Sequence, residues 1–137
     1  MSLVIDSSIA LAWIYFDETT EPVRKVYERL IQGSAWVPAL WRLEVANVLE
    51  TGVRRKRHHA AFRDSTLADL SLLPIQLDPE TDTHAWSETL KLAVKHQLTL
   101  YDGAYLELAL RRGLPLASLD QDLRAAAKAE NLALLGM

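Results

Sequence analysis

The sequence of 137 residues contains no cysteine, which excludes disulfide bonds, cysteine nucleophiles and cysteine-ligated zinc. It also lacks an apolar run long enough to cross a bilayer, because Ile9 to Phe16 falls well short of the roughly 20 residues that a membrane helix needs. Asp6 stands where an export signal requires a basic residue and then an unbroken apolar segment. We therefore expect a cytoplasmic protein with no membrane association.

Glycine and proline are scarce, at five residues each, and no linker, repeat or low-complexity tract interrupts the chain. Hydrophobic residues make up 50% and charged residues 24%, which is typical of a folded globular protein. We expect one domain over residues 1–137. The formal net charge of −3 counts mildly against a nucleic-acid binder. A cluster of metal-binding carboxylates would itself make the total negative.

Short apolar runs bounded by turn residues have the length of β-strands. Between them, apolar residues repeat with the spacing of helices. This alternation predicts an α/β fold with a central parallel sheet covered on both faces. The predicted strands are Leu3 to Ile5, Ala35 to Val37, Ile75 to Leu77, Leu116 to Leu119 and Leu132 to Leu135.

The predicted helices follow from apolar stripes and their stop signals. Gly33 and Gly113 should end two of them. Another should begin at Asp78 and Pro79, and the stretch from His59 to Leu73 is also expected to be helical. The stripes are Val23, Val26, Tyr27, Leu30 and Ile31; Val45, Ala46, Leu49 and Val53; Trp86, Leu90, Ala93 and Val94; and Tyr101, Ala104, Tyr105, Leu108 and Ala109.

Two acidic residues end predicted strands, Asp6 in LVID and Asp120 in LASLD. Two more, Glu44 and Asp102, lie in the first turns of predicted helices. In parallel sheets, ligands bind beyond the carboxyl ends of the strands. The same residues also suit structural roles: Asp6 and Asp120 as N-caps, Asp102 in a capping box with Thr99, and Glu44 as a solvated helix residue. Several carboxylates at one edge would repel each other, and a hard divalent cation relieves that repulsion.

Four segments, VIDSSIALAWI, PALWRLEVANVL, LYDGAYLELA and LASLDQDL, resemble in order and spacing the signature blocks of PIN-domain ribonucleases, and in particular the VapC-type toxins of prokaryotic toxin–antitoxin pairs. The resemblance matches Asp6, Glu44, Asp102 and Asp120 to the four acids of the family. Asp122 falls where some members carry an extra acid. The sequence departs at Gly103, where alanine is commoner, and at Ser118, where threonine is commoner.

The resemblance implies a three-layer α/β/α sandwich with strand order 3-2-1-4-5. It implies a metal-dependent endoribonuclease that acts as a toxin and cleaves structured RNA, either tRNA or rRNA, with Mg²⁺ or Mn²⁺. A small antitoxin protein should bind it and cover or intrude on the acidic site, and the chain is expected to form a homodimer.

For the catalytic chemistry we expect Asp6, Asp102 and Asp120 to ligate the metal. Glu44 would orient or deprotonate the attacking water, or complete a second metal site. Accessory roles are expected for Ser7, Asn47, Ser118 and Asp122. A polar helix face explains Asn47 equally well, because it shares that face with Glu44 and Thr51.

The strongest basic run is Arg54-Arg55-Lys56-Arg57, followed by two histidines. It would steer RNA phosphates toward the acids, or it simply places cations at a helix C-terminus, where they are stabilising. His84 and His96 show no metal-ligand spacing. The four tryptophans, Trp13, Trp36, Trp41 and Trp86, are expected to pack, although Trp36 or Trp41 would also suit a partner surface.

Two other functions remain open. A phosphatase of the haloacid-dehalogenase type uses a second aspartate two residues after its nucleophile, whereas Asp6 is followed by Ser7 and Ser8. A catalytically silent PIN fold that only binds another protein would not need all four acids.

Overall fold

The computed structural model describes residues 2–137, and its strands form one parallel sheet in the order β3-β2-β1-β4-β5. The predicted strand order and parallel sheet are thereby confirmed. The last two strands are shorter than predicted. The bounds are β1 Ser2–Ile5, β2 Ser34–Val37, β3 Ile75–Leu77, β4 Leu116–Ala117 and β5 Leu134–Leu135.

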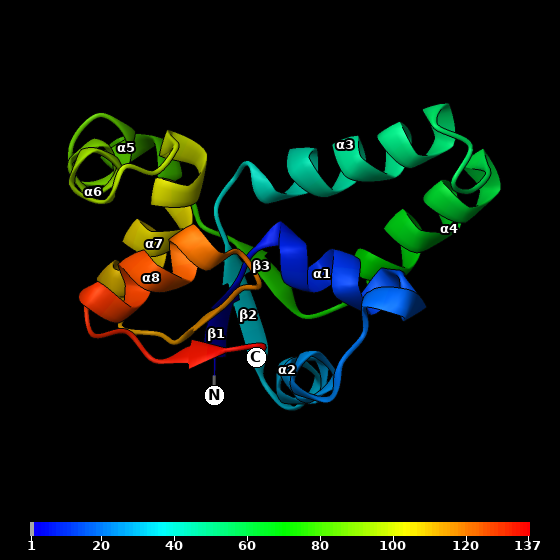
Figure 1. Ribbon diagram of the computed structural model, residues 1–137, viewed down its shortest axis with the longest axis horizontal. Coiled ribbons are helices and arrows are strands. Elements are labelled where there is room, and N and C mark those ends of the chain that lie inside the picture. The colour runs from blue at the N-terminus through cyan, green and yellow to red at the C-terminus, as the bar shows by residue number, and fades with distance from the viewer. Residues whose placement is uncertain (1) are drawn as a thin grey trace.

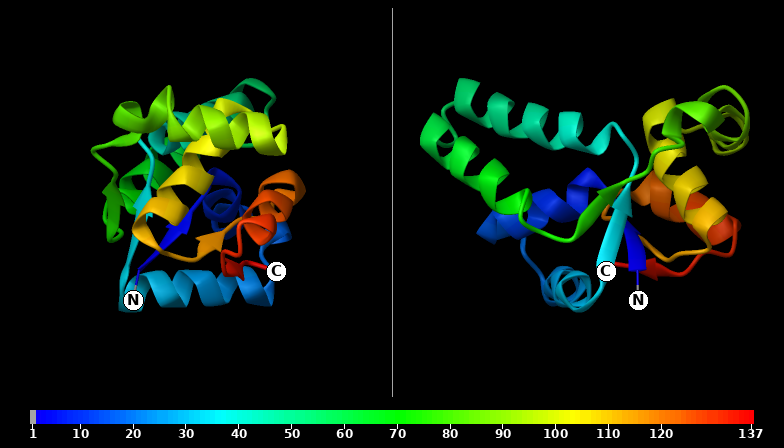
Figure 2. Two further views of the ribbon diagram at one scale, coloured as in Figure 1. Left: turned by 90° about the vertical axis from the view of Figure 1, so that its left-hand side faces the viewer. Right: turned by 180° about the vertical axis from the view of Figure 1, so that it is seen from behind.

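Helices α1 to α4 lie on one side of the strands and α5 to α8 on the other, which gives the three-layer sandwich (Figures 1 and 2). Because both faces are covered, the residues of β1 from Leu3 to Ile5 are completely buried. The helices are α1 Ser7–Ile14, η1 Phe16–Glu18 (a short 3₁₀ helix), α2 Glu21–Gln32, α3 Trp41–Arg54, α4 Ala60–Leu70, α5 Thr81–Ala85, α6 Glu88–His96, α7 Leu100–Arg112 and α8 Gln121–Ala129.

The strand order reverses between β1 and β4, which pair with Val4 opposite Leu116 and Ile5 opposite Ala117. Their carboxyl ends therefore lie side by side, and the chain leaves them at Asp6 and after Ser118. The two helices that follow, α1 and α8, begin at this edge, as do α3 and α7 (Figure 1). The fold thus gathers four helix N-termini around one place.

The prediction of one helix that begins at Asp78 is wrong in two respects. It is broken into α5 and α6 at Trp86, whose side chain is 92% exposed, and its large apolar residues Leu90 and Val94 are also exposed. Asp78 does not cap α5, because it is held in ion pairs with two arginines, and the N-cap residue of α5 is Glu80.

Close packing between α6 and α7 explains why this stripe faces outward. A Cβ atom at Gly103 would lie 3.2 Å from the carbonyl oxygen of Thr89 and 3.3 Å from Cβ of Ala93. Only small residues fit between the two helices, so Thr89 and Ala93 are the buried residues of α6. Despite Gly103, α7 is continuous from Leu100 to Arg112.

The other three tryptophans pack as predicted. Trp13 donates its indole N–H to the carbonyl of Val23 at 3.0 Å, Trp41 is buried, and Trp36 lies beneath the guanidinium of Arg112. Among residues 2–137, no helix combines the length and the apolar character needed to cross a membrane.

Candidate acidic site

Asp6 is buried at the end of β1, where it caps α1. Its carboxylate accepts hydrogen bonds from the backbone N–H of Ile9 at 3.2 Å, from Ser8 Oγ at 2.6 Å and from Ser118 Oγ at 2.6 Å. Burial raises the pKa of Asp6; the two serine hydroxyls oppose that rise, and the negative charge of Asp120 adds to it. The residue therefore serves as a cap and also faces another carboxylate.

Two serines tie the ends of β1 and β4 together. Ser118 is completely buried and accepts the backbone N–H of Asp120 at 3.0 Å, in addition to donating to Asp6. Ser8 Oγ accepts the backbone N–H of Leu119 at 3.0 Å. The structure thus places Ser118 at the site, as expected. Within residues 2–137, Ser8 and not Ser7 makes the side-chain contact to Asp6.

Asp120 follows β4 and caps α8 by accepting the backbone N–H of Leu123 at 2.8 Å. Its predicted capping role is therefore present together with its position at the sheet edge. Asp122 lies two residues further on, in the first turn of α8, and is exposed.

Glu44 lies in the first turn of α3, half-buried, and accepts a hydrogen bond from the hydroxyl of Tyr105. Burial raises the pKa of Glu44, the bond from Tyr105 opposes the rise, and the charge of Asp6 adds to it. The sequence placed Tyr105 only in the apolar stripe of its helix. Its position three residues after Asp102, on the same helix face, was the available signal.

Asp102 lies in the first turn of α7, where its backbone N–H is accepted by Oγ1 of Thr99 at 3.1 Å. This is half of a capping box, because among residues 2–137 the Asp102 carboxylate makes no hydrogen bond of its own. Burial, followed by the charges of neighbouring carboxylates, raises the pKa of Asp102 to about 6. These neighbours are Asp120, Glu44, Asp6 and Asp122.

The four acids, hereafter the acid edge (Asp6, Glu44, Asp102 and Asp120), therefore share one electrostatic environment. Within residues 2–137 none of them forms an ion pair with a basic side chain. Nor does any group of three histidine, aspartate or glutamate side chains in that range lie ready to surround one ion. The reason is local: three of the carboxylates are turned toward protein donors, namely serines, a tyrosine and helix N–H groups.

Asn47 is exposed on α3 and makes no side-chain hydrogen bond within residues 2–137. It lies one turn after Glu44, as the sequence indicated. The structure therefore leaves both a substrate contact and a plain polar surface possible for this residue.

The basic run lies at the far end of α3, ten residues or about 15 Å along the helix from Glu44. Arg54 pairs with Glu50 at 2.8 Å. Arg57 pairs with Glu18 at 2.9 Å, and its guanidinium stacks on an aromatic ring of the core, that of Tyr15. Two of the four cations are thus already engaged within the chain.

Arg55 and Lys56 are the exposed members of the run that form no ion pair within residues 2–137. Arg55 is the C-cap residue of α3, and Lys56 adopts a positive φ of 63° in the turn that follows. These two side chains are the ones free to meet an external anion.

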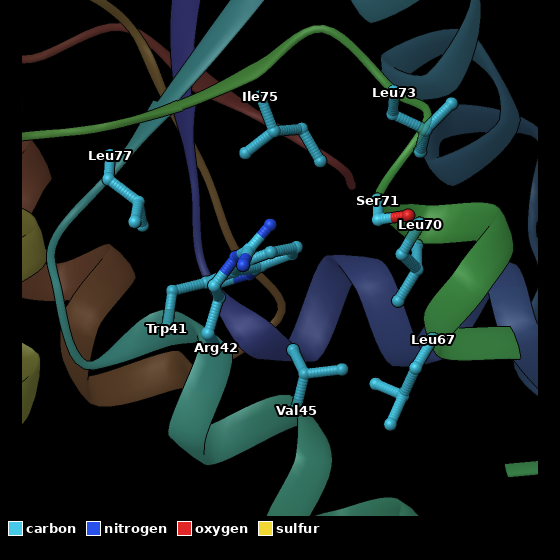
Figure 3. A pocket seen from close by; sticks show the side chains of 9 residues that line it. All are labelled: Trp41, Arg42, Val45, Leu67, Leu70, Ser71, Leu73, Ile75 and Leu77. Atoms are coloured by element: carbon cyan, nitrogen blue, oxygen red, sulfur yellow. The ribbon is translucent and has the colours of Figure 1, made fainter. Parts of the chain in front are cut away.

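A partly open pocket of about 250 Å³ lies away from the acid edge, between α3, α4 and β3 (Figure 3). Trp41, Arg42 and Val45 extend into it from α3, opposite leucines from α4 and β3. None of the four acids lines this pocket. Its residues are Trp41, Arg42, Val45, Leu67, Leu70, Ser71, Leu73, Ile75 and Leu77.

Residues 3–129 match the PIN domain model, so the chain belongs to the PIN domain family. It is similar to Ribonuclease VapC3 of Pyrobaculum aerophilum, with 29% identity over 127 residues that cover 90% of this chain and 92% of that protein. These findings confirm the resemblance to VapC-type proteins.

Solved structures support the same fold. PAE2754 from Pyrobaculum aerophilum superimposes with a TM-score of 0.71 at 26% identity, covering 98% of this chain and 83% of that one. VapC20 from Mycobacterium tuberculosis, described as a sarcin-ricin loop cleaving toxin, gives a TM-score of 0.62 at 14% identity and covers 90% and 94%. At that identity, VapC20 is evidence for the fold alone.

Proposed function

We propose that the protein is a metal-dependent endoribonuclease and the toxin of a toxin–antitoxin pair. The observation that carries the proposal is the acid edge. Beyond the carboxyl ends of β1 and β4, four carboxylates from four separate elements lie near enough to influence one another's pKa, without a basic partner among residues 2–137. A purely structural cluster would be paired with cations. The similarity to a VapC ribonuclease supports the choice of RNA as substrate.

Asp6, Asp102 and Asp120 would hold Mg²⁺ or Mn²⁺, since carboxylate oxygens are the donors these ions prefer. The donor chemistry fits. Burial is the largest cause of the raised pKa of Asp102, and the repulsion from neighbouring carboxylates that adds to it is what a cation would relieve. When bound, the ion lowers the pKa of its water and polarises the phosphate. Glu44 would orient the attacking water or accept its proton.

The substrate is proposed to be structured RNA, a tRNA or an rRNA loop, as the resemblance to VapC-type ribonucleases implies. Arg55 and Lys56 are the members of the basic run best placed to bind phosphates, because Arg54 and Arg57 are committed to ion pairs. The proposed location of the protein is the cytoplasm, where tRNA and rRNA are found.

Asp6→Asn and Asp102→Asn test the activity directly. Each purified variant is incubated with total tRNA and rRNA in Mn²⁺ or Mg²⁺, and cleavage ends are mapped. We expect the wild type to cleave, EDTA to stop it, and both variants to lose activity. Asp69→Asn, an exposed carboxylate on α4, is the control and should cleave normally. Wild-type rates in both variants together with indifference to EDTA would refute the proposal.

The partners proposed are a small antitoxin and a second copy of the chain. The antitoxin is expected to cover the acid edge, so its addition should block both cleavage and the growth arrest caused by expression. A homodimer is supported by the apolar side chains left exposed around α6, where Trp86 is 92% and Val94 71% exposed. Val94→Glu should then shift the mass measured by light scattering from dimer to monomer, and a monomeric wild type would contradict this.

A further inference from the structure

Tyr105 makes a polar contact with the acid edge from the middle of a core helix. Its ring is 1% exposed, in α7, and its hydroxyl donates to Oε1 of Glu44 in α3, 61 residues away in sequence. Tyrosine hydroxyls that are buried require a partner, and here that partner is a carboxylate of the candidate site. The bond therefore links α7 to α3 at the acid edge.

The four acids differ in how firmly the protein holds them. Asp6 accepts three hydrogen bonds, and Asp120 is fixed by capping α8. Within residues 2–137, the hydroxyl of Tyr105 is the only donor to the Glu44 side chain. Glutamate has three rotatable bonds, so a single anchor decides where this carboxylate points.

We propose that Tyr105 is a positioning residue that holds one oxygen of Glu44 and leaves the other directed to the reacting water. Tyr105 itself does not touch substrate, because its side chain is buried. The inference rests on the proposed nuclease function, and it identifies the group that sets the orientation of Glu44 for that reaction.

The chemistry of the pair agrees with this role. Burial raises the pKa of Tyr105, and the adjacent Glu44 carboxylate raises it further, so the phenol stays protonated and remains a donor. Donation to Glu44 in turn favours the ionised carboxylate, which is the form able to accept a proton from water. A phenylalanine at this position would fill the same space without supplying that hydrogen bond.

Tyr105→Phe in the full chain is the direct test, assayed for kcat and KM on cleavable RNA with Mn²⁺. We expect kcat to fall roughly 10–100-fold, as for loss of other groups that orient active-site ligands, with KM within twofold of wild type. In the Glu44→Gln background the same change should have no further effect on kcat, because the residue that Tyr105 positions is already disabled.

Tyr15→Phe is the matched control, since Tyr15 is also buried and its hydroxyl lies 2.9 Å from Nε2 of His58, away from the acids. The Tyr15→Phe variant should be less stable than the wild type and should have the same kcat. A kcat within twofold of wild type in Tyr105→Phe, or a loss that adds fully to that of Glu44→Gln, overturns the inference. The near-ultraviolet tyrosine spectrum of Glu44→Ala checks the bond independently, because alanine removes the acceptor whereas the amide oxygen of glutamine would keep it. An unchanged spectrum in Glu44→Ala also overturns the inference.

These outcomes separate this inference from the proposed function. If Asp6→Asn is inactive and Glu44→Gln is strongly slowed while Tyr105→Phe is fully active, only the positioning role fails. If the first two variants cleave normally, the nuclease site itself is misassigned.

Discussion

The two ends of α7 carry acids in opposite electrostatic settings. At its N-terminal end, Asp102 belongs to the acid edge. Burial is the largest cause that raises its pKa to about 6, and neighbouring carboxylates are the next. Toward its C-terminal end lies an arginine cluster (Asp78, Glu107, Arg111 and Arg112), in which Arg111 bonds Asp78 at 2.5 Å and Glu107 at 2.8 Å.

Burial alone does not distinguish these regions, because Asp6, Asp78 and Glu107 are all buried. What distinguishes them is the presence of fixed cations. In the arginine cluster the counter-charge belongs to the chain, which is the arrangement of a structural ion-pair network. At the acid edge, within residues 2–137, no basic side chain offsets the carboxylates, and a site of that kind is suited to an external cation.

Removing Asp78 should have the largest effect on folding. Asp78→Ala leaves Arg111 and Arg112 without their shared carboxylate, and breaking a buried pair in this way costs about 3–5 kcal/mol. Urea unfolding at pH 7 measures the loss. Asp82→Ala, an exposed acid on α5, is the control and should be nearly neutral. Equal stabilities for the two variants would mean that the arginine cluster is not structural.

Lowering the pH should remove part of the stabilisation that the Asp78 ion pairs provide. Burial on its own would raise the pKa of Asp78, but hydrogen bonds from Arg111 and Arg112 outweigh it and leave the pKa lowered. The stabilisation is therefore complete above the unfolded value of about 4 and is lost as pH falls through the lower folded pKa. The stability difference between wild type and Asp78→Ala should shrink in urea titrations from pH 5 to pH 2. A difference independent of pH would contradict the ion pair.

Removing a carboxylate from the acid edge should have the opposite effect on folding stability. Asp102→Asn removes a half-buried charge whose pKa is raised, so the metal-free variant should be more stable than wild type at pH 7, by about 1 kcal/mol after solvent screening. The gain should disappear below about pH 4, where Asp102 is protonated in both folded and unfolded chains. Calorimetry in EDTA measures it.

With added Mn²⁺ the wild type should become more stable than Asp102→Asn. Only the wild type keeps the full set of carboxylates, and binding of the ion stabilises the folded state. If Asp102→Asn is destabilising in EDTA, repulsion at the acid edge is not significant.

The smallest effect is expected at the basic run, the third charged region. Arg55→Gln with Lys56→Gln should reduce the slope of log binding constant against log salt by roughly one to two for RNA. Arg54→Gln with Arg57→Gln should change it less, since both arginines are already paired. Both double variants are made in the inactive Asp6→Asn protein, so that the RNA stays intact, and their RNA affinities are measured by filter binding over a series of salt concentrations. Identical salt slopes for the two double variants would exclude a selective role for Arg55 and Lys56.

Sequence patterns predicted the parts of the fold that depend on local chemistry. The apolar runs located all five strands, and the acids that end two of them, Asp6 and Asp120, lie at the predicted sheet edge. Glu44 and Asp102 lie in the first turns of their helices, as predicted. Their nearness to one another depends on topology, which the family resemblance supplied.

The errors arose where a neighbouring element decides the outcome. The stripe of Trp86, Leu90 and Val94 has the spacing of a buried helix face, but α7 approaches α6 so closely that only Thr89 and Ala93 fit between them. Tyr105 was missed as a polar contact for the converse reason, because a tyrosine in an apolar stripe does not reveal which acid its hydroxyl reaches.

The hydrogen bond from Ser118 to Asp6 joins residues 112 positions apart, near opposite ends of the chain. During synthesis Asp6 leaves the ribosome long before its partner Ser118 and before Asp120. A nascent chain that does not yet include Ser118 and Asp120 therefore cannot assemble the acid edge, and any activity that depends on this edge must wait until β4 has paired with β1.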